Sequence, residues 1–313
     1  MKKESMIETM KAQTFGTEVE MYNITREDAA KLAASFFGTG RYEYTASRNG
    51  YATWSAWDQQ NREWKFQRDV SIDDIESRKC EMVTPILRYE DIESLQELIR
   101  KLRAAGAKSD PNHGCGVHVH IGANGHTPKT LRNLANIMAS HESLLIKALK
   151  LDEYRMDHYC STVNERFLRD INEKKPKTMD EFANIWYIGN GADRGRNEHY
   201  NNSRYHMLNL HATFTKGTIE FRLFEFANPH NGKGGGLHAG RLKTYIQLSM
   251  ILSAAAKLAK SASPKEPQRE NPKYAMRTWL LRLGFIGEEF ATARKFLTRD
   301  LEGDASFRNG RAA

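Results

Sequence analysis

The chain has no segment that suggests a membrane helix or a secretory signal. No run of about 18 apolar residues, the length that a membrane helix needs, occurs in the sequence. The first residues, MKKESMIETMKAQ, hold no apolar stretch of the kind that directs secretion. We therefore expect a globular protein of the cytoplasm with no membrane partner.

Cysteine is scarce. The chain has three cysteines, Cys80, Cys115 and Cys160, and no two of them form a CxxC pair. An odd number of widely spaced cysteines does not support a disulfide framework, and it is typical of reduced thiols. We expect these side chains in the protein core.

Signatures of nucleophilic catalysis and of a phosphate loop are missing as well. The sequence has neither a Gx[ST]xG elbow nor a cysteine-histidine signature, so it offers no nucleophile of these kinds. The glycine-rich run 231–236 is not a GxxxxGK[ST] loop, because Gly234 follows Lys233. Lys233 is a candidate for contact with a nucleotide phosphate, and the alternative is a loop that covers the site.

Positive charge exceeds negative charge without forming a basic tail. The formal net charge is +8, and Lys and Arg are spread along the chain without interleaved aromatic residues. A nucleic-acid partner is therefore not favoured, whereas a polyanionic ligand such as a nucleotide is compatible with this charge.

Caps, turns and hydrophobic periodicity predict helices and strands in no regular βαβ order. Thr25 and Gly38 bracket one helix, and Thr127 begins another. We expect helices at 25–37, 91–105, 127–149 and 237–260, and hairpins of 51–57 with 62–70 and of 205–214 with 218–226. This order favours an α+β fold, a mainly antiparallel sheet with helices packed on one face.

Proline and mixed charge mark a linker near the end of the chain. Residues 261–273 hold three prolines together with Lys, Glu and Arg. We expect a catalytic domain at 1–260, this linker at 261–273, and a C-terminal helical appendage at 274–313.

Four separated segments read as strands that carry metal-binding or phosphate-binding residues on one face. They are FGTEVEMYN with Glu18 and Glu20, KCEMVTP with Glu81, CGVHVHIG with His118 and His120, and GTIEFRLF with Glu220 and Arg222. Residues i and i+2 of a strand project from the same face. Burying these charges is costly without partners, and divalent cations would supply the partners.

The residue types indicate which ions and ligands would bind. Glutamate suits Mg²⁺ or Mn²⁺, and a histidine can complete such a site, although two histidines on one strand also fit zinc. Arg222 can stabilise charge on a transferring phosphoryl group, and Arg204 in SRYHMLNL is expected to point into the same region. Asp69 in WKFQRDVS is a further metal ligand or an amine-binding carboxylate.

The ordered set GTEVE, WKFQRDVS, CEMVTP, GVHVHIG, RYHMLNL and GTIEFRLFE resembles the amidoligase family, a branch of the carboxylate-amine ligases related to glutamine synthetase and γ-glutamylcysteine ligase. The resemblance covers roughly residues 14–260. It implies a glutamine-synthetase-like catalytic sheet where ATP meets Mg²⁺ or Mn²⁺. It also implies a ligase that phosphorylates a carboxylate and lets an amine attack the acyl phosphate.

The resemblance also implies roles for single residues. The implied metal ligands are Glu18, Glu20, Glu81, His118, His120 and Glu220, with His120 favoured over His118. Arg222 and Arg204 would contact phosphate or the substrate carboxylate. The implied partners are a carboxylate and an amine, on a peptide, a protein tail or an amino-acid-like molecule. The alternatives are a zinc-dependent hydrolase, a phosphotransferase related to guanidino kinases, and a binding module without catalysis.

Overall fold

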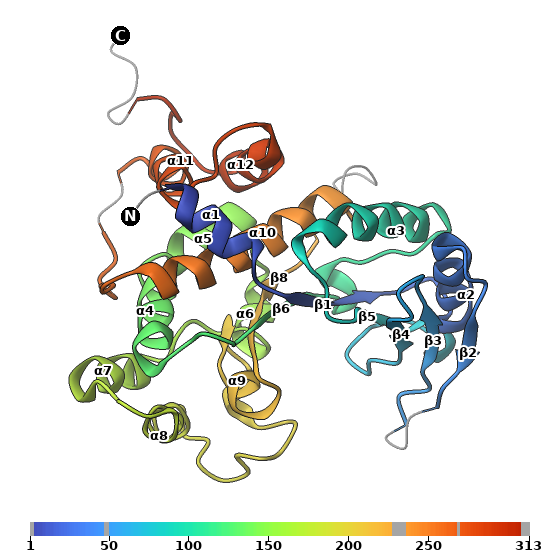
Figure 1. The fold of residues 1–313 in the computed structure, drawn as a ribbon, viewed down its shortest axis with the longest axis horizontal. Coiled ribbons are helices and arrows are strands. Elements are labelled where there is room, and N and C mark those ends of the chain that lie inside the picture. Colours follow the sequence, from blue (N-terminus) through green and yellow to red (C-terminus); the bar gives the residue numbers. More distant parts are fainter. Residues whose placement is uncertain (1–2, 47–49, 227–235, 268–269, 308–313) are drawn as a thin grey trace. The chain divides into compact units, whose positions relative to one another are not determined.

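The computed structural model describes residues 3–46, 50–226, 236–267 and 270–307. Within these ranges the chain forms twelve α-helices and eight strands (Figure 1). The residues divide into two compact units, which we call the sheet unit (14–119 and 224–243) and the helical unit (1–13, 120–223 and 244–313).

The sheet unit is built on strands in the order β2-β3-β4-β5-β1-β6. Their bounds are β1 Phe15–Met21, β2 Tyr42–Tyr44, β3 Trp54–Trp57, β4 Glu63–Gln67, β5 Cys80–Val83 and β6 Val117–Gly122, and the second half of β6 is counted in the helical unit. The pairs β2 with β3, β3 with β4, β4 with β5 and β1 with β5 are antiparallel. The predicted hairpin of 51–57 with 62–70 is confirmed as β3 and β4.

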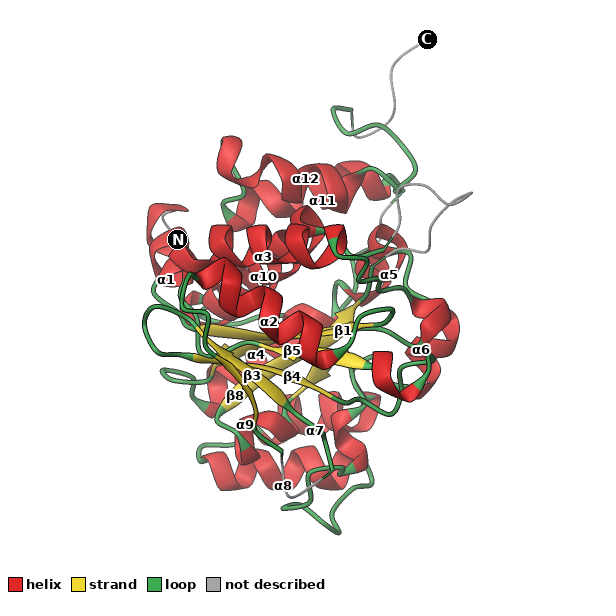
Figure 2. Cartoon of the chain, turned by 90° about the vertical axis from the view of Figure 1, so that its right-hand side faces the viewer, coloured by secondary structure: helices red, strands yellow, loops and turns green. Residues whose placement is uncertain are grey.

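Helices α2 (Arg26–Phe37) and α3 (Ile92–Ala104) belong to the sheet unit. The Thr25 hydroxyl accepts the N–H of Asp28 at 3.0 Å, and Gly38 closes α2 with a φ of 73°. α2 packs against β3 and β4 and against α3, and Figure 2 shows it above the yellow strands. The predicted α+β class, with a mainly antiparallel sheet covered by helices, is confirmed.

The helical unit gathers most of the helices and a short run of sheet in the order β6-β8-β7. Its elements are α1 Lys3–Lys11, α4 Pro128–Ala139, α5 Glu142–Leu149, α6 Glu153–His158, α7 Glu165–Lys174, α8 Met179–Gly189, β7 Leu208–Asn209, α9 His211–Thr215, β8 Thr218–Phe224, α10 Ala239–Leu258, α11 Pro272–Leu283 and α12 Ala291–Thr298. The end of β8 and the start of α10 are counted in the sheet unit. α7 packs on α8 and α4, while α11 and α12 pack on each other and on α1 and α5 respectively.

Two sequence predictions were wrong in this unit. The helix expected at 127–149 is divided into α4 and α5, because the Ser140 hydroxyl donates to the Ile137 carbonyl at 3.1 Å and α4 ends there. The strand expected at 205–214 is only Leu208–Asn209, and the chain then turns into α9. The Asn209 side chain accepts the N–H of Ala212 at 3.4 Å, a local bond that favours a helical turn over an extended strand.

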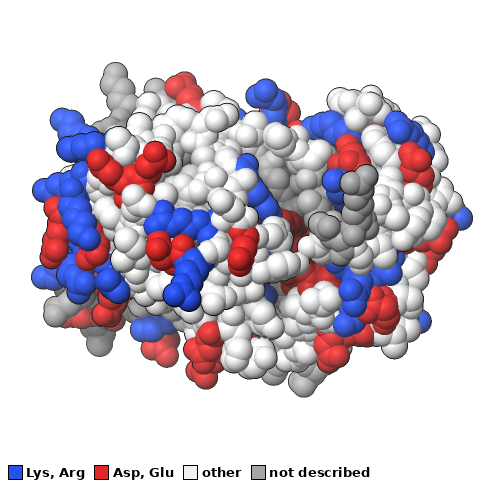
Figure 3. Space-filling view, turned by 90° about the horizontal axis from the view of Figure 1, so that it is seen from below, with Lys and Arg blue, Asp and Glu red and all other residues white. Residues whose placement is uncertain are grey.

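Two further observations concern the helices and the charge on the surface. Among the described residues, no helix combines the length and the apolar character that crossing a bilayer demands. On the face drawn in Figure 3, Lys and Arg intermingle with Asp and Glu. The positive charge on that face is therefore not gathered into one patch.

Candidate active site

A pair of buried glutamates lies at the centre of the sheet unit. In the register of β1 with β5, Glu20 is the direct partner of Glu81, and Val19 is the partner of Met82. Glu20 is 4% exposed and Glu81 is 5% exposed. Because side chains alternate along a strand, the two carboxylates share one face while Val19 and Met82 fill the core on the other. Like charges in directly opposed positions destabilise a sheet.

Each of these carboxylates receives a neutral hydrogen bond. The Gln67 side-chain amide donates to Glu81 Oε2 at 2.7 Å, and β4 places Gln67 directly opposite Glu81. The backbone N–H of Gly116 donates to Glu20 Oε2. Such bonds satisfy single oxygen atoms but add no positive charge.

His118, Glu18 and Asp69 extend this group. His118 Nδ1 lies 2.9 Å from Glu18 Oε2, and its Nε2 lies 3.9 Å from Glu20 Oε1. Asp69 follows β4, and its Oδ1 accepts the N–H of Ser71 at 2.7 Å. We call Glu18, Glu20, Asp69, Glu81 and His118 the acidic cluster.

The acidic cluster contains two overlapping sets of ligand atoms. One set is Glu18, Glu81 and His118, the other is Glu20, Asp69 and Glu81, and within each set the atoms lie within 4.8 Å of one another. Glu81 belongs to both sets. The pKa of Glu81 is raised well above its ordinary value, first by burial and then by the charges of Glu18, Asp69 and Glu20.

The donor chemistry of the cluster fits a hard divalent cation. Carboxylate oxygens predominate, each set holds at most one imidazole, and neither set contains a thiolate. Oxygen-rich sites of this kind suit Mg²⁺ or Mn²⁺, whereas zinc favours more nitrogen and sulfur ligands. A cation would also offset the mutual repulsion that burial makes costly.

A second buried charge group lies in the helical unit. Arg222 Nη1 donates to Glu220 Oε1 at 2.6 Å, and the Asn209 amide donates to Glu220 Oε2 at 2.7 Å. Glu220 and Arg222 are 2% and 4% exposed, and β7 sets Asn209 directly opposite Glu220. His120 and Glu220 offer ligand atoms within 4.8 Å of each other, and His120 Nδ1 lies 3.1 Å from Thr218 Oγ1.

Arg204 and Arg222 approach the same aromatic ring. The Cζ atom of Arg204 lies 5.7 Å from the centroid of the Tyr205 ring, and that of Arg222 lies 5.9 Å from it. Arg204 belongs to the 3-10 turn Asn202–Arg204, which lies directly before the segment 205–214 that the sequence predicted as a hairpin strand. We call Arg204, Arg222, Glu220 and Asn209 the arginine cluster.

The structure thus groups the predicted residues by unit. Glu18, Glu20, Asp69, Glu81 and His118 lie together in the sheet unit, and His120, Glu220, Arg222 and Arg204 belong to the helical unit. Lys233 lies outside the described residues.

Sequence reasoning missed three polar residues of these groups. Gln67 stands two positions before Asp69, so strand alternation could have singled it out. Asn209 could be found only from the register of β7 with β8. Arg155 of α6 is 6% exposed and donates to the Arg222 carbonyl at 3.2 Å, a contact that no local sequence pattern indicates.

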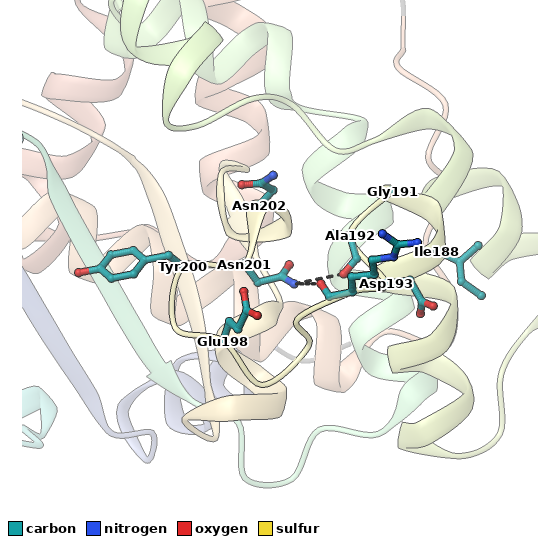
Figure 4. Close-up of a pocket in the computed structure, with 9 residues that line it drawn as sticks. Ile188, Gly191, Ala192, Asp193, Glu198, Tyr200, Asn201 and Asn202 are labelled. Carbon is teal, nitrogen blue, oxygen red and sulfur yellow. Dashed lines mark hydrogen bonds between the residues drawn. The ribbon is translucent and has the colours of Figure 1, made fainter.

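The helical unit also holds an open pocket of about 590 Å³ (Figure 4). It is lined by Ile188, Gly191, Ala192, Asp193, Arg194, Glu198, Tyr200, Asn201 and Asn202. The buried Asn201 amide donates to the carbonyls of Ala192 and Arg194, both at 3.1 Å, and holds this loop in shape. None of the residues predicted from the sequence lines this pocket.

The chain thus has an α+β fold with a group of buried carboxylates and a histidine on its sheet, and known proteins share features with it. The family model described as "Putative amidoligase enzyme" matches residues 11–253. This match covers well over half of the chain, and the chain therefore belongs to that amidoligase family. The resemblance predicted from the six motifs is confirmed.

Comparison with solved structures gave a match to the crystal structure of a bifunctional glutathione synthetase from Pasteurella multocida. The TM-score is 0.47 at 15% sequence identity, over 95% of this chain and 48% of that one. This chain therefore spans about half the length of that protein. A comparison with curated proteins gave no match.

Proposed function

We propose that the chain is an ATP-dependent carboxylate-amine ligase that forms an amide through an acyl phosphate. One observation carries the proposal beyond family membership. Four carboxylates and one imidazole meet in two overlapping sets within a single compact unit, with Glu81 common to both. Such sets suit two neighbouring cations that share a carboxylate, an arrangement common in phosphoryl-transfer enzymes.

The acidic cluster is proposed to hold Mg²⁺ or Mn²⁺. Glu18, Glu81 and His118 would bind one ion, and Glu20, Asp69 and Glu81 the other. The bound ions would neutralise negative charge on the ATP phosphates. Glu220 and His120 are proposed as further ligands, since they offer a carboxylate and an imidazole atom close together in the helical unit.

The arginine cluster is proposed to bind phosphate or the substrate carboxylate. A guanidinium has five N–H donors in a planar fork, so Arg222 can hold Glu220 and an anion at the same time. Arg222 donates from Nη1 to Glu220 Oε1 at 2.6 Å and from Nε to the Tyr159 carbonyl at 3.4 Å, and these two bonds fix its orientation. Arg204, which approaches the Tyr205 ring as Arg222 does, would add a second positive charge.

The proposed reaction asks the protein for positioning and charge neutralisation. The substrate carboxylate attacks the γ-phosphorus of ATP and ADP leaves, after which the amine nitrogen attacks the acyl carbon and phosphate leaves. Neither step requires a protein nucleophile, which is consistent with a sequence that lacks the elbow and cysteine signatures.

We propose that residues 1–260 carry this activity and that 274–313 form an appendage, joined by the linker 261–273. The appendage helices are not isolated within the helical unit. Lys11 of α1 forms an ion pair with Glu289 at 2.8 Å, and His141 stacks on Trp279 at 4.0 Å. These contacts support a role for α11 and α12 in holding α1 and α5.

A screen for ADP release tests the proposal. With MgCl₂ present, ADP should accumulate over repeated turnovers only when both a carboxylate and an amine are supplied, and Glu20→Gln and Glu220→Gln should abolish this release. Glu43→Gln is the matched control, because that side chain is exposed on β2 at the edge of the sheet unit. Calorimetry that detects no binding of nucleotide in the presence of Mg²⁺ would overturn the proposal.

The same screen, together with elemental analysis, separates two of the alternative functions. A phosphotransferase would release ADP with a phosphorylated product and without any amine. A zinc hydrolase would retain stoichiometric zinc through purification, and elemental analysis would detect this zinc. Its activity would not depend on ATP.

A further inference from the structure

A tyrosine continues the row of ligand residues on β1. The backbone of Tyr22 is extended and paired with Lys108 through N–H to carbonyl bonds of 2.8 and 3.0 Å. Residues i, i+2 and i+4 of extended chain share one face, so Tyr22 projects from the face that carries Glu18 and Glu20. The Tyr22 side chain therefore follows Glu20 on the face of the sheet that carries the acidic cluster.

Tyr22 holds an aspartate and a histidine in place. Its hydroxyl donates to Asp110 Oδ2 at 2.7 Å, and Asp110 Oδ1 lies 2.9 Å from His113 Nδ1. The Tyr22 and His113 rings stack with centroids 3.8 Å apart and an interplanar angle of 13°. Asp110 is 2% exposed, while the His113 side chain is 38% exposed. A buried carboxylate thus orients a solvent-accessible imidazole.

The loop that carries His113 is fastened to the loop that carries Asp69. The His113 carbonyl accepts the N–H of Asp73 at 2.9 Å. Gly114 has a φ of +70°, and a β-carbon there would lie 2.5 Å from the Ser71 carbonyl oxygen. Ser71 is itself bound through its N–H to Asp69. The histidine and the ligand Asp69 are therefore parts of one closely packed pair of loops.

We propose that His113 accepts the proton that the amine loses when it attacks the acyl phosphate, and that Asp110 is the positioning residue for this base. The inference rests on the proposed ligase function and adds a residue to it. An Asp that accepts from Nδ1–H leaves Nε2 of the neutral ring as the acceptor. The accessible edge of the ring then faces the nucleophile while Asp110 stabilises the imidazolium that forms.

The step balances without another reactant. The amine nitrogen forms the C–N bond to the acyl carbon, the C–O bond to phosphate breaks, and phosphate leaves with the electron pair. One N–H proton passes to Nε2 of His113 and is later released to solvent. Asp110 and Tyr22 both contact the His113 ring, and Cys115 lies with Tyr22 and Ile72 in a small apolar cluster.

A comparison of two nucleophiles tests the catalytic role. Hydroxylamine is uncharged near pH 7, attacks acyl phosphates readily and can release its N–H proton to water, whereas attack by the more basic alkylamine depends on a base that takes up the proton. In His113→Gln, amide formation with the amine selected by the ADP screen should fall about 10²- to 10⁴-fold, while hydroxamate formation should fall less than about tenfold. Asp110→Asn should show the same split, and His158→Gln, a change of an exposed histidine on α6, should show neither loss.

Two results would overturn the inference while leaving the ligase proposal intact. One is an equal loss of amide and hydroxamate in His113→Gln, which would indicate a structural role, and the other is full retention of both. Absence of hydroxamate and amide in the unmodified protein would instead contradict the ligase proposal.

A measurement on the free protein decides the geometry without any substrate. ¹⁵N-detected NMR of histidine-labelled protein should show that the neutral form of His113 carries its proton on Nδ1 and none on Nε2. Asp110→Asn should change this tautomer balance. A proton found on Nε2 of neutral His113 in the unmodified protein would refute the proposed base, whatever the activity assays show.

Discussion

Replacing Glu81 by Gln should make the metal-free protein more stable. An atom of the Glu81 carboxylate lies within 4.8 Å of ligand atoms of Glu20 and of Glu18. Two unit charges at that separation repel by about 3.5 kcal/mol at an effective dielectric constant of about 20. The raised pKa of Glu81 shows that proton uptake relieves part of this repulsion, so we expect a net gain of about 1–2 kcal/mol. The new amide oxygen can still accept from Gln67.

The same substitution should remove the response to magnesium. A ligand that binds only the native state stabilises it by about 2.7 kcal/mol at a concentration of 100 Kd. Glu81 is common to both ligand sets, so Glu81→Gln should lose most of that gain. Urea unfolding followed by the fluorescence of the five tryptophans, with EDTA or with MgCl₂, measures both quantities.

Glu43→Gln provides the matched control for this experiment. Its carboxylate is 55% exposed and lies 3.5 Å from Arg41, so the change should shift stability by less than about 0.5 kcal/mol in either buffer. If Glu81→Gln were no more stable than the unmodified protein in EDTA and still gained the full stabilisation from MgCl₂, the acidic cluster could not be the metal site.

Two further predictions concern the stability of variants at residues that are not proposed as ligands. Burial, reinforced by the charge of Glu266, raises the pKa of Glu142 from its ordinary 4.5 to about 7, so the folded state binds this proton more tightly than the unfolded state. The contribution of Glu142 to stability is therefore fully present below about pH 4.5 and is lost as the pH rises through about 7. Urea midpoints measured between about pH 5 and 8 should show this decline, and Glu142→Gln should flatten it. An unchanged dependence of the midpoint on pH in Glu142→Gln would contradict the assignment. Gly114→Ala should destabilise the protein by more than Gly217→Ala, because both residues have a φ of +70° but only Gly114 would place a β-carbon against the Ser71 carbonyl. We expect about 1 kcal/mol for Gly217→Ala and at least twice that for Gly114→Ala in thermal or urea unfolding, and equal losses would refute the close approach.

Local sequence patterns were sufficient for much of the fold. The helix from Thr25 to Gly38 has a capping side chain at its start and a glycine at its end, and the structure contains both. The alternation in FGTEVEM and GVHVHIG identified strands with two ligand-type side chains on one face, because the period of a strand depends only on its own backbone. The six ordered motifs were also enough for the amidoligase family, which the family model confirms.

Local patterns failed where a side chain competed with the backbone. The sequence 127–149 is uniformly helical in character, yet Ser140 bonds back to Ile137 and divides it. Likewise Thr and Phe around 211–215 favour a strand, but the short loop between β7 and β8 is helical. Propensity is a weak signal at such positions, since one hydrogen bond can outweigh it.

The sequence by itself thus singled out most of the residues that we propose to carry the chemistry, namely the glutamates, the histidines and Arg222 of the four strands. Only the tertiary structure decided which of them meet. The register of β1 with β5 sets Glu20 against Glu81, β4 brings Gln67 to the same place, and a loop packed beside Asp69 presents His113. These partners lie at least 14 residues apart in the sequence, so burial and strand register, which depend on the whole chain, decide their contacts.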